Sequence, residues 1–483
     1  MAEERERSFI KSEDWWALWI GLFIFVLALF ALAKVSLLGW AVKTSTWVTL
    51  SKALAPVSKV YKGLPGFAAL ILTYLFLLVV MTVGARILGA DTKKYVGGFT
   101  IIFWLSYFCW IAGHYAYIAS TPDVRGKFGI PWSLSLTGEA GYILALLLGL
   151  VIGNFFTGFA NYLREAARPE WYIKTAIVLM GAGLGVKACE ALGLATAVLF
   201  RGLCAIVEAY LIYWAVVYFI ARRYFGFSRE WAAPLASGIS ICGVSAAIAT
   251  GAAIRARPIV PVMVSSLVIV FAVVELLILP FAAQAFLYKE PMVAGAWMGL
   301  AVKTDGAAMA SGAMVDALIR AKASVVQGIQ YQADWMLMAT TTTKIFIDMF
   351  IGIWAFLLAV IWCYYIECKP GEKVPPIEIW YRFPKFVIGY FLTFLMMLGI
   401  GLAEPGLVKT TLQAVTAQTD TFRQLFFVLT FFSIGVISNF RVLRQEGIGR
   451  LAVVYGVALF GFILWVGLAI SWIFFHGIKP PLA

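Results

Sequence analysis

The chain has 483 residues, of which 62% are hydrophobic and 13% are charged, and its formal net charge is +13. Its mean hydropathy is +0.90, which excludes a soluble globular protein and indicates an integral membrane protein. The excess lysine and arginine lies in short loops, where membrane topology explains it better than a nucleic-acid partner does. We therefore expect a multi-pass protein of the cell membrane (inner or plasma membrane), surrounded by the lipid bilayer.

Windows of about 20 apolar residues predict the membrane-spanning helices. We expect about 11 to 13 of them in an all-α fold, because some of the thirteen candidate windows do not cross the bilayer simply. In chain order these windows cover residues 15–38, 66–84, 97–119, 140–158, 171–189, 199–221, 232–253, 260–284, 293–314, 336–366, 384–402, 421–438 and 451–475. The pattern divides the chain into an N-terminal three-span extension (1–138), the first part of a core (139–366) and C-terminal helices that complete the core (384–475).

Two windows differ from the others in composition. Residues 234–251 and 295–314 are rich in glycine, alanine, serine and threonine where neighbouring spans use leucine, isoleucine, valine and phenylalanine. Such segments survive at membrane depth when they are buried in protein or line a cavity. We predict that both are broken helices that approach each other, because a matched pair is typical of inverted-repeat secondary transporters. Close helix packing through small residues is the alternative.

The first of these segments carries groups that suit an anion. Ser240, Cys242 and Ser245 surround Gly243, where we expect one helix to stop and the next to start. The first amides of a new helix lack partners and lie at the positive end of the helix dipole. They bind an anion without a full counter-charge.

The second segment carries two charges in an apolar setting, with Lys303 and Asp305 on either side of Thr304. Each charge at the bilayer centre costs about 2.5 to 3.5 kcal/mol, so we expect a functional reason for keeping them. Alternatively, the two side chains neutralise each other, or Lys303 snorkels to the membrane surface.

Four further charged positions fall within predicted spans. Lys344 and Asp348 are four residues apart and share a helix face, either as a pair at the membrane edge or facing the same cavity as Lys303. Glu208 and Glu275 lie in mid-span and need partners such as Arg201. Each is a candidate proton carrier. The alternative is a structural role, in which the carboxyl group holds neighbouring helices together.

The first segment contains Ser240-Ile241-Cys242-Gly243-Val244-Ser245-Ala246, followed by Ile254-Arg255-Ala256. With these residues the chain resembles, from about residue 140 to 475, the putative sulfate exporter family, which is related to the cation/proton antiporter and bile-acid transporter class. The resemblance implies an inverted-repeat secondary transporter that exports sulfate or a related sulfur oxyanion or sulfonate. The chain departs from the family pattern where a histidine-aspartate pair is usual, because Lys303 and Thr304 stand there.

We therefore expect a small anion as the substrate, and the candidate residues fall into two groups. The substrate-binding candidates are Ser240, Cys242, Gly243, Ser245, Lys303, Thr304 and Lys344, and the coupling or proton-carrying candidates are Asp305, Glu208 and Glu275. No cofactor or metal is expected, and a homodimer is compatible with the sequence. The alternatives are a passive anion channel and a membrane-embedded enzyme. An enzyme is not expected, because the chain has two histidines and no H-E-x-x-H motif. The sequence also has no P-loop, so we expect transport powered by a gradient or by the substrate itself.

Overall fold

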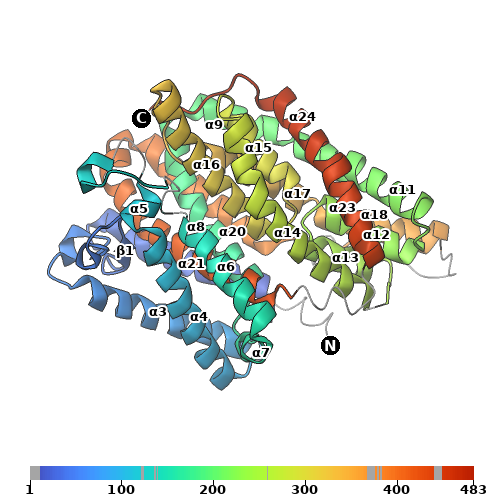
Figure 1. Ribbon diagram of the computed structural model, residues 1–483, viewed down its shortest axis with the longest axis horizontal. Helices are drawn as coiled ribbons and strands as arrows, with labels where there is room; N and C mark the ends of the chain where they lie inside the picture. The colour runs from blue at the N-terminus through green and yellow to red at the C-terminus, as the bar shows by residue number, and fades with distance from the viewer. Residues whose placement is uncertain are drawn as a thin grey trace. The chain divides into compact units, whose positions relative to one another are not determined.

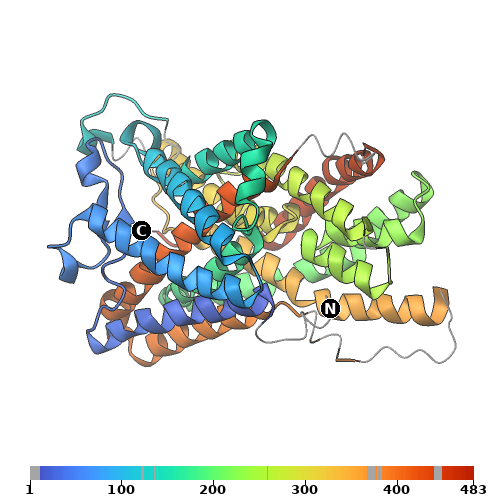
Figure 2. The same cartoon turned by 90° about the horizontal axis from the view of Figure 1, so that it is seen from below.

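The computed structural model describes residues 11–120, 125–134, 138, 140–257, 259–366, 376–377, 380, 383–439 and 449–482. Within these residues the fold is helical, apart from one two-stranded hairpin (Figures 1 and 2). In this part of the chain, 10 helices are long and apolar enough to cross a membrane, or up to 11 if a bent helix pair counts as one span. The prediction of a multi-pass, helical membrane protein is confirmed.

The upper end of the predicted span number is too high, and three windows account for the difference. In window 140–158, α6 (Ala140–Phe155) bends by 117° into α7 (Thr157–Leu163). In windows 232–253 and 293–314 the helix stops and restarts, which leaves short pieces such as Val244–Ala253 and Pro291–Ala301. A hydropathy window averages over such a break and therefore cannot detect it.

The chain forms two compact units, and the first comprises Met1–Ala195, Arg320–Gln330 and Lys385–Ile437. Its α-helices are α2 (Glu13–Leu29), α3 (Gly66–Ile87), α4 (Thr92–Gly113), α5 (Ala116–Ala119), α6, α7, α8 (Pro169–Glu190), α20 (Lys385–Ala403) and α21 (Gln413–Ile437). Short helical turns are η1 (Phe30–Ala33), η2 (Leu50–Lys52), η3 (Lys59–Tyr61), η4 (Arg125–Phe128), η7 (Pro405–Leu407) and η8 (Val408–Leu412). Strands β1 (Val42–Thr44) and β2 (Leu54–Pro56) pair antiparallel, with Lys43 opposite Ala55.

Glycine allows the helices of the first unit to pack closely. A Cβ atom on Gly149 of α6 would lie 2.3 Å from the carbonyl oxygen of Phe432, and one on Gly435 of α21 would lie 2.4 Å from that of Leu146. The backbones of α6 and α21 are therefore in direct contact, as is common where membrane helices cross. Lys174 of α8 also forms an ion pair with Asp14 of α2, with 3.1 Å between Nζ and Oδ1.

The second unit comprises Thr196–Ile319, Tyr331–Pro384 and Ser438–Ala483. Its α-helices are α10 (Cys204–Ile206), α11 (Trp214–Arg223), α12 (Arg229–Ser240), α13 (Val244–Ala253), α14 (Ile259–Phe286), α15 (Pro291–Ala301), α17 (Trp335–Met349), α18 (Ile351–Ile361), α23 (Gly449–Ala458) and α24 (Leu464–Phe475). Helices α9 (Leu192–Gly202) and α16 (Asp305–Gln327) belong mostly to this unit. Three π-helical turns complete it, namely η5 (Val207–Tyr213), η6 (Trp362–Ile366) and η9 (Leu459–Ile463).

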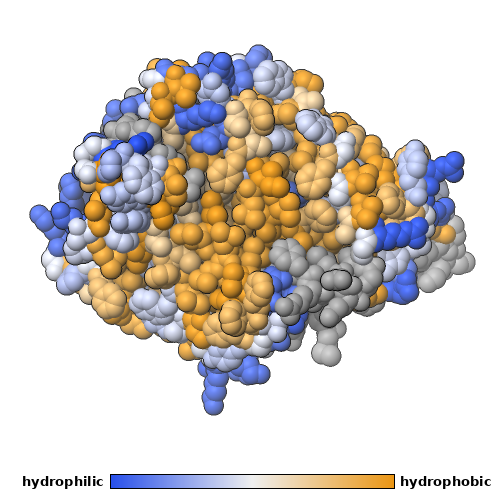
Figure 3. Space-filling model, viewed as in Figure 1, coloured by the Kyte–Doolittle hydropathy of each residue, from blue (hydrophilic) through white to orange (hydrophobic). Residues whose placement is uncertain are grey.

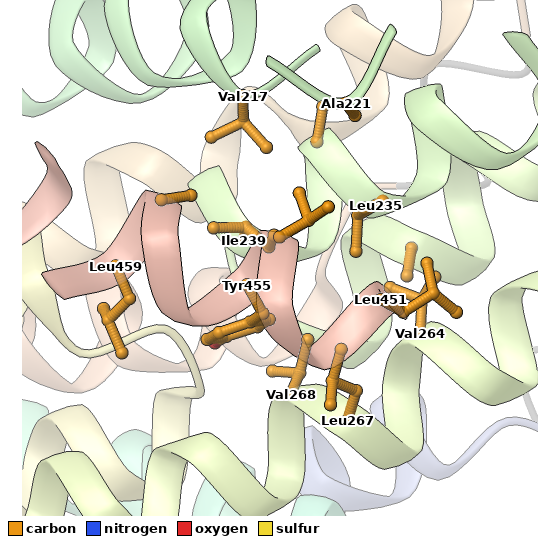
Figure 4. Packing of buried hydrophobic residues seen from close by; sticks show 14 of the residues in the cluster. Val217, Ala221, Leu235, Ile239, Val264, Leu267, Val268, Leu451, Tyr455 and Leu459 are labelled. Atoms are coloured by element: carbon orange, nitrogen blue, oxygen red, sulfur yellow. The ribbon is translucent and has the colours of Figure 1, made fainter. Parts of the chain in front are cut away.

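A buried apolar cluster positions the helices of the second unit. Val217 of α11, Leu235 of α12 and Val264 of α14 pack together with Leu451 and Tyr455 of α23 (Figure 4). Phe271 of α14 stacks on Tyr455 with 4.2 Å between ring centroids, so α14 and α23 are held face to face. The outer surface is also largely hydrophobic, as Figure 3 shows for one face, which suits contact with lipid. The cluster fixes the end of α12, where the candidate site begins.

Substitution of Gly435 tests the close contact between α6 and α21. We expect Gly435→Ala to destabilise the protein by about 1–3 kcal/mol, because the new methyl group meets backbone atoms that cannot move aside. The matched control is Gly399→Ala in α20, where the Cβ atom would have nothing within 4 Å. Thermal unfolding in detergent measures both. Equal unfolding temperatures for the two variants would contradict the contact.

Candidate functional site

The first helix break lies between α12 and α13. α12 ends at Ser240 and α13 begins at Val244. Between them Gly243 has φ +70° and ψ −108°, a conformation that favours glycine because it has no Cβ. A Cβ atom there would also lie 2.6 Å from Val268 Cγ1. The predicted interruption at Gly243 is confirmed.

The second break lies between α15 and α16. α15 ends at Ala301, Val302 is extended with φ −81° and ψ 126°, and α16 begins at Asp305. The hydroxyl of Thr304 accepts a hydrogen bond from the amide of Ala307 at 3.3 Å, so Thr304 caps the start of α16. The acidic Asp305 in the first turn complements the positive end of the helix dipole.

The two breaks lie against each other, as predicted. A Cβ atom on Gly243 would lie 3.2 Å from the carbonyl oxygen of Lys303 and 3.2 Å from Thr304 Cγ2. Glycine at 243 is therefore required twice, by its backbone conformation and by the close approach of the second break. The irregular backbone of one break covers that of the other, so both are enclosed within the second unit.

Lys344 of α17 connects the two breaks. Its side chain is fully buried, and Nζ donates hydrogen bonds to the carbonyl oxygen of Ile241 at 2.8 Å and to that of Lys303 at 3.3 Å. Nζ also lies 3.6 Å from Asp305 Oδ1. A surface pair of Lys344 with Asp348 at the membrane edge is therefore wrong, because Asp348 is 1% exposed. One ammonium group satisfies carbonyl groups that both breaks leave without a helical partner.

Two carboxylates and a thiol lie near this ammonium group. The Sγ atom of Cys242 and carboxylate oxygens of Asp305 and Asp348 lie within 4.8 Å of one another, and all three residues are buried. Their spacing could hold a metal ion. The charge of Lys344, however, already interacts with Asp348, Asp305 and Cys242. The arrangement is thus a buried cluster of two carboxylates and a thiol beside the ammonium group of Lys344.

Lys303 has a different set of partners. Its ammonium group donates to the carbonyl oxygen of Leu300 and lies 4.4 Å from the centroid of the Tyr213 ring, a cation–π arrangement. Its backbone amide donates to Glu275 Oε2 at 3.1 Å. Lys303 is fully buried, so it does not snorkel. Asp305 pairs with Lys344 instead of Lys303, so the alternative of a mutually neutralising Lys303–Asp305 pair is not supported.

Glu208 lies in the π-helical turn η5 and is fully buried. Neither of its carboxylate oxygens has a hydrogen-bond partner among the residues that the structure describes. Its charge interacts with Lys303, whereas Arg201 donates to the carbonyl oxygen of Phe474 at 2.6 Å. Arg201 is therefore not the partner that the sequence suggested. A π-helical turn often marks a functional position.

Buried carboxyl groups outnumber buried ammonium groups at the site. The buried ammonium groups belong to Lys303 and Lys344, and the buried carboxyl groups belong to Glu208, Glu275, Asp305 and Asp348. If all six were ionised, the net charge would be −2. Each uncompensated charge in such surroundings costs several kcal/mol. The site therefore favours bound protons or another source of positive charge.

The hydroxyl groups of the first break have different surroundings. Ser240 is fully buried, and its Oγ atom has no hydrogen-bond partner in the described part of the chain. Ser245, in the first turn of α13, is half-buried. In contrast, Ser237 accepts hydrogen bonds from Trp214 Nε1 at 2.9 Å and Thr250 Oγ1 at 2.7 Å. Of the two buried serines, Ser240 is thus the one whose hydroxyl has no partner among the described residues.

Some of the small residues serve packing, as the alternative interpretation had it. A Cβ atom on Gly299 would lie 2.0 Å from Thr343 Oγ1, and one on Gly312 would lie 2.5 Å from Thr340 Oγ1. Thr340 Oγ1 donates to the carbonyl oxygen of Gly295 at 2.6 Å. These glycines bring α15 and α16 onto α17, which carries Lys344 towards the breaks.

Sequence reasoning missed the role of Tyr213, whose ring lies below Lys303. Its hydroxyl donates to the carbonyl oxygen of Ile463 at 2.7 Å. A Cβ atom on Gly467 of α24 would lie 2.7 Å from that hydroxyl and 3.3 Å from Glu208 Oε1. Tyr213, Glu208 and Gly467 are thus neighbours. The chain has 20 tyrosines, and nothing in the sequence distinguishes Tyr213 from the others.

Comparisons with known proteins agree with one another. Residues 134–454 match the family model described as conserved hypothetical protein 698. A UPF0324 membrane protein from Nitrosomonas europaea is 45% identical over 98% of this chain and 97% of its own length. An uncharacterized protein from Archaeoglobus fulgidus is 55% identical over 30% of this chain and 87% of its own length.

A UPF0324 membrane protein from Nitratidesulfovibrio vulgaris is 28% identical over 83% of this chain and 63% of its own length. No solved structure matches this chain. The chain belongs to the UPF0324 family of membrane proteins, the family of conserved hypothetical protein 698.

Proposed function

We propose that this protein is a secondary transporter that binds a small anion at the two helix breaks and takes up protons on buried carboxyl groups as it does so. The observation that carries the proposal is the contact between the two breaks, with Lys344 joining them. Broken helices whose ends face each other form the substrate sites of many secondary transporters. The two pairs, α12 with α13 and α15 with α16, would be corresponding elements of an inverted repeat.

The anion would bind at the start of α13. The amides of Gly243 and Ser245 and the hydroxyl of Ser240 are the donors proposed there, with Cys242 as a neighbour. α13 has 10 residues, so it is long enough for its first turn to carry the positive end of a helix dipole. The second, independent support is that Ser240 Oγ is buried without a partner among the described residues. Thr304 and Lys303 would close the site from the second break.

Proton uptake follows from the charge balance. With Glu208, Glu275, Asp305 and Asp348 all ionised, the site would repel a divalent anion, because the two lysines offset only half of the negative charge. Protons on Asp305, Glu208 or Glu275 would remove that repulsion. In this proposal Lys344 mainly holds the breaks together, and Lys303 is the lysine closer to a substrate role, because a tyrosine ring is among its partners.

The substrate class comes from the resemblance to the sulfate exporter family. It favours sulfate, or a related sulfur oxyanion or sulfonate, and it favours export. A membrane potential that is negative inside drives an anion outward, by about 2.3 kcal/mol per charge per 100 mV.

The rival function is a passive anion channel, whose flux would rise linearly with the gradient. We do not propose an enzyme, because a nucleophilic cysteine is usually activated by a histidine. The neighbours of Cys242 are carboxylates and a lysine, and His476 Nδ1 lies 3.3 Å from Glu290 Oε2 instead.

Transport into liposomes tests the proposal. We expect saturable flux of labelled sulfate, or of sulfite or a sulfonate, and weaker flux of a simple carboxylate. Because anion binding takes up protons, the apparent affinity should rise as pH falls from about 8 to 6, and a pH gradient should drive flux. Asp305→Asn should reduce the pH dependence. Flux that does not saturate with substrate concentration would favour the channel. Flux that does not change with pH would contradict proton coupling.

Replacement of Lys303 tests the site itself. We expect Lys303→Met to insert and fold but to lose saturable transport by at least about tenfold, because a buried substrate-facing charge is removed. Lys289→Met is the control, since Lys289 is exposed and lies outside both breaks. Size-exclusion profiles and thermal unfolding check folding. Unchanged transport in Lys303→Met would show that Lys303 has only a structural role.

A further inference from the structure

We propose that the first unit carries a binding site for one anionic phospholipid, formed by the β1–β2 hairpin and the groove beside it. The site lies in the N-terminal extension and does not depend on the transport proposal. Three features support it: the position of the hairpin at one membrane surface, its charge, and an apolar groove that opens beside the same residues.

The position follows from chain topology. The hairpin connects two candidate membrane spans, Glu13–Ala33 and Gly66–Ile87, so residues 34–65 lie at one face of the bilayer. Hydrogen bonds fix the hairpin on the unit: the amide of Val42 donates to Thr73 Oγ1 at 3.0 Å, and Trp47 Nε1 donates to the carbonyl oxygen of Ile111 at 2.8 Å. The hairpin is therefore held against the ends of α3 and α4, at headgroup level.

The charge of this segment is entirely positive. From residue 15 to residue 90 the sequence contains no aspartate or glutamate. The connection carries five exposed lysines, Lys34, Lys43, Lys52, Lys59 and Lys62, and none has an ion pair within the described residues. Clustered lysines at a membrane surface attract anionic lipid headgroups. Two tryptophans, Trp40 and Trp47, add the aromatic side chains that favour this level of the bilayer.

The groove provides a place for an acyl chain. It has a volume of about 480 Å³ and runs between the hairpin, α3 and α4, where Leu50, Leu54, Phe67, Leu70, Trp104 and Phe108 line it. This volume lies within the range of small-molecule sites in proteins. Ser51 also lines the groove, and Lys52 follows it in the same helical turn, η2. A lipid could therefore place a chain in the groove and its phosphate at Lys52.

A phospholipid is the occupant that fits both features. A soluble anion would use the lysines but not the groove, and a neutral lipid would use the groove but not the lysines. The groove faces the region that lipid tails occupy, because α3 and α4 are both candidate spans. A protein partner would have to displace lipid from it.

Native mass spectrometry of the full-length protein in nanodiscs tests the proposal. We expect phosphatidylglycerol to be retained over phosphatidylcholine. Lys52→Gln should weaken this retention by about fivefold, the effect of one lysine near an anionic surface, and substitution of all five lysines by glutamine should abolish the preference. Ser51→Trp, which fills the groove from an exposed position, should release lipid even with all lysines present. Lys93→Gln, at an exposed lysine of α4, is the control.

Two results would overturn the proposal. The first is equal retention of both lipids, or equal losses in Lys52→Gln and Lys93→Gln, which would mean that the lysines have no specific role. The second is competition by soluble glycerol phosphate at similar concentration, or no effect of Ser51→Trp, which would indicate a free-anion site without an acyl chain. Sulfate transport in Lys52→Gln is expected to stay at the wild-type level, which separates this site from the transport site.

Discussion

The hydrogen bonds of Lys344 are the interaction on which the candidate site depends. A helix that ends inside a protein leaves its last carbonyl groups without partners, and the end is negative. The second unit contains two such ends close together, and one buried ammonium group donates to the carbonyl oxygens of Ile241 and Lys303. Without that group, both breaks and the neighbouring Asp305 would lose their positive partner. The lysine thus allows an irregular backbone to persist at membrane depth.

The remaining features of the site follow from this contact. Because Lys344 interacts with Asp305, Asp348 and Cys242, these three side chains are held close together. Because the two backbones meet at Gly243, the start of α13 lies against the second break. Lys303 and Glu275 are joined by the backbone amide of Lys303, so movement at the second break would change the surroundings of both. The proposed coupling of an anion to protons rests on these contacts.

The sequence predicted much of this because the decisive signals are local. Glycine and hydroxyl residues at apolar depth mark the breaks, and charges within apolar windows identify Lys303, Asp305, Lys344, Glu208 and Glu275. Pairing is not local, and there the prediction was incomplete. Asp305 meets Lys344 rather than Lys303 because α17 crosses both breaks, and Glu208 interacts with Lys303 rather than Arg201. The 117° bend after α6 is equally invisible to a hydropathy average. The substrate and coupling roles of these residues stay predictions.

Hydrogen–deuterium exchange of Lys344→Met tests most directly whether one side chain holds both breaks. The account predicts that amides of residues 241–245 and 302–306 exchange faster together in the variant, while amides in the α11–α12–α14 cluster keep their wild-type protection. Lys303→Met provides the comparison and should leave residues 241–245 protected, because its ammonium group donates to Leu300 of α15 and lies over the Tyr213 ring instead of contacting the first break. Unchanged exchange at either break in Lys344→Met would contradict the account.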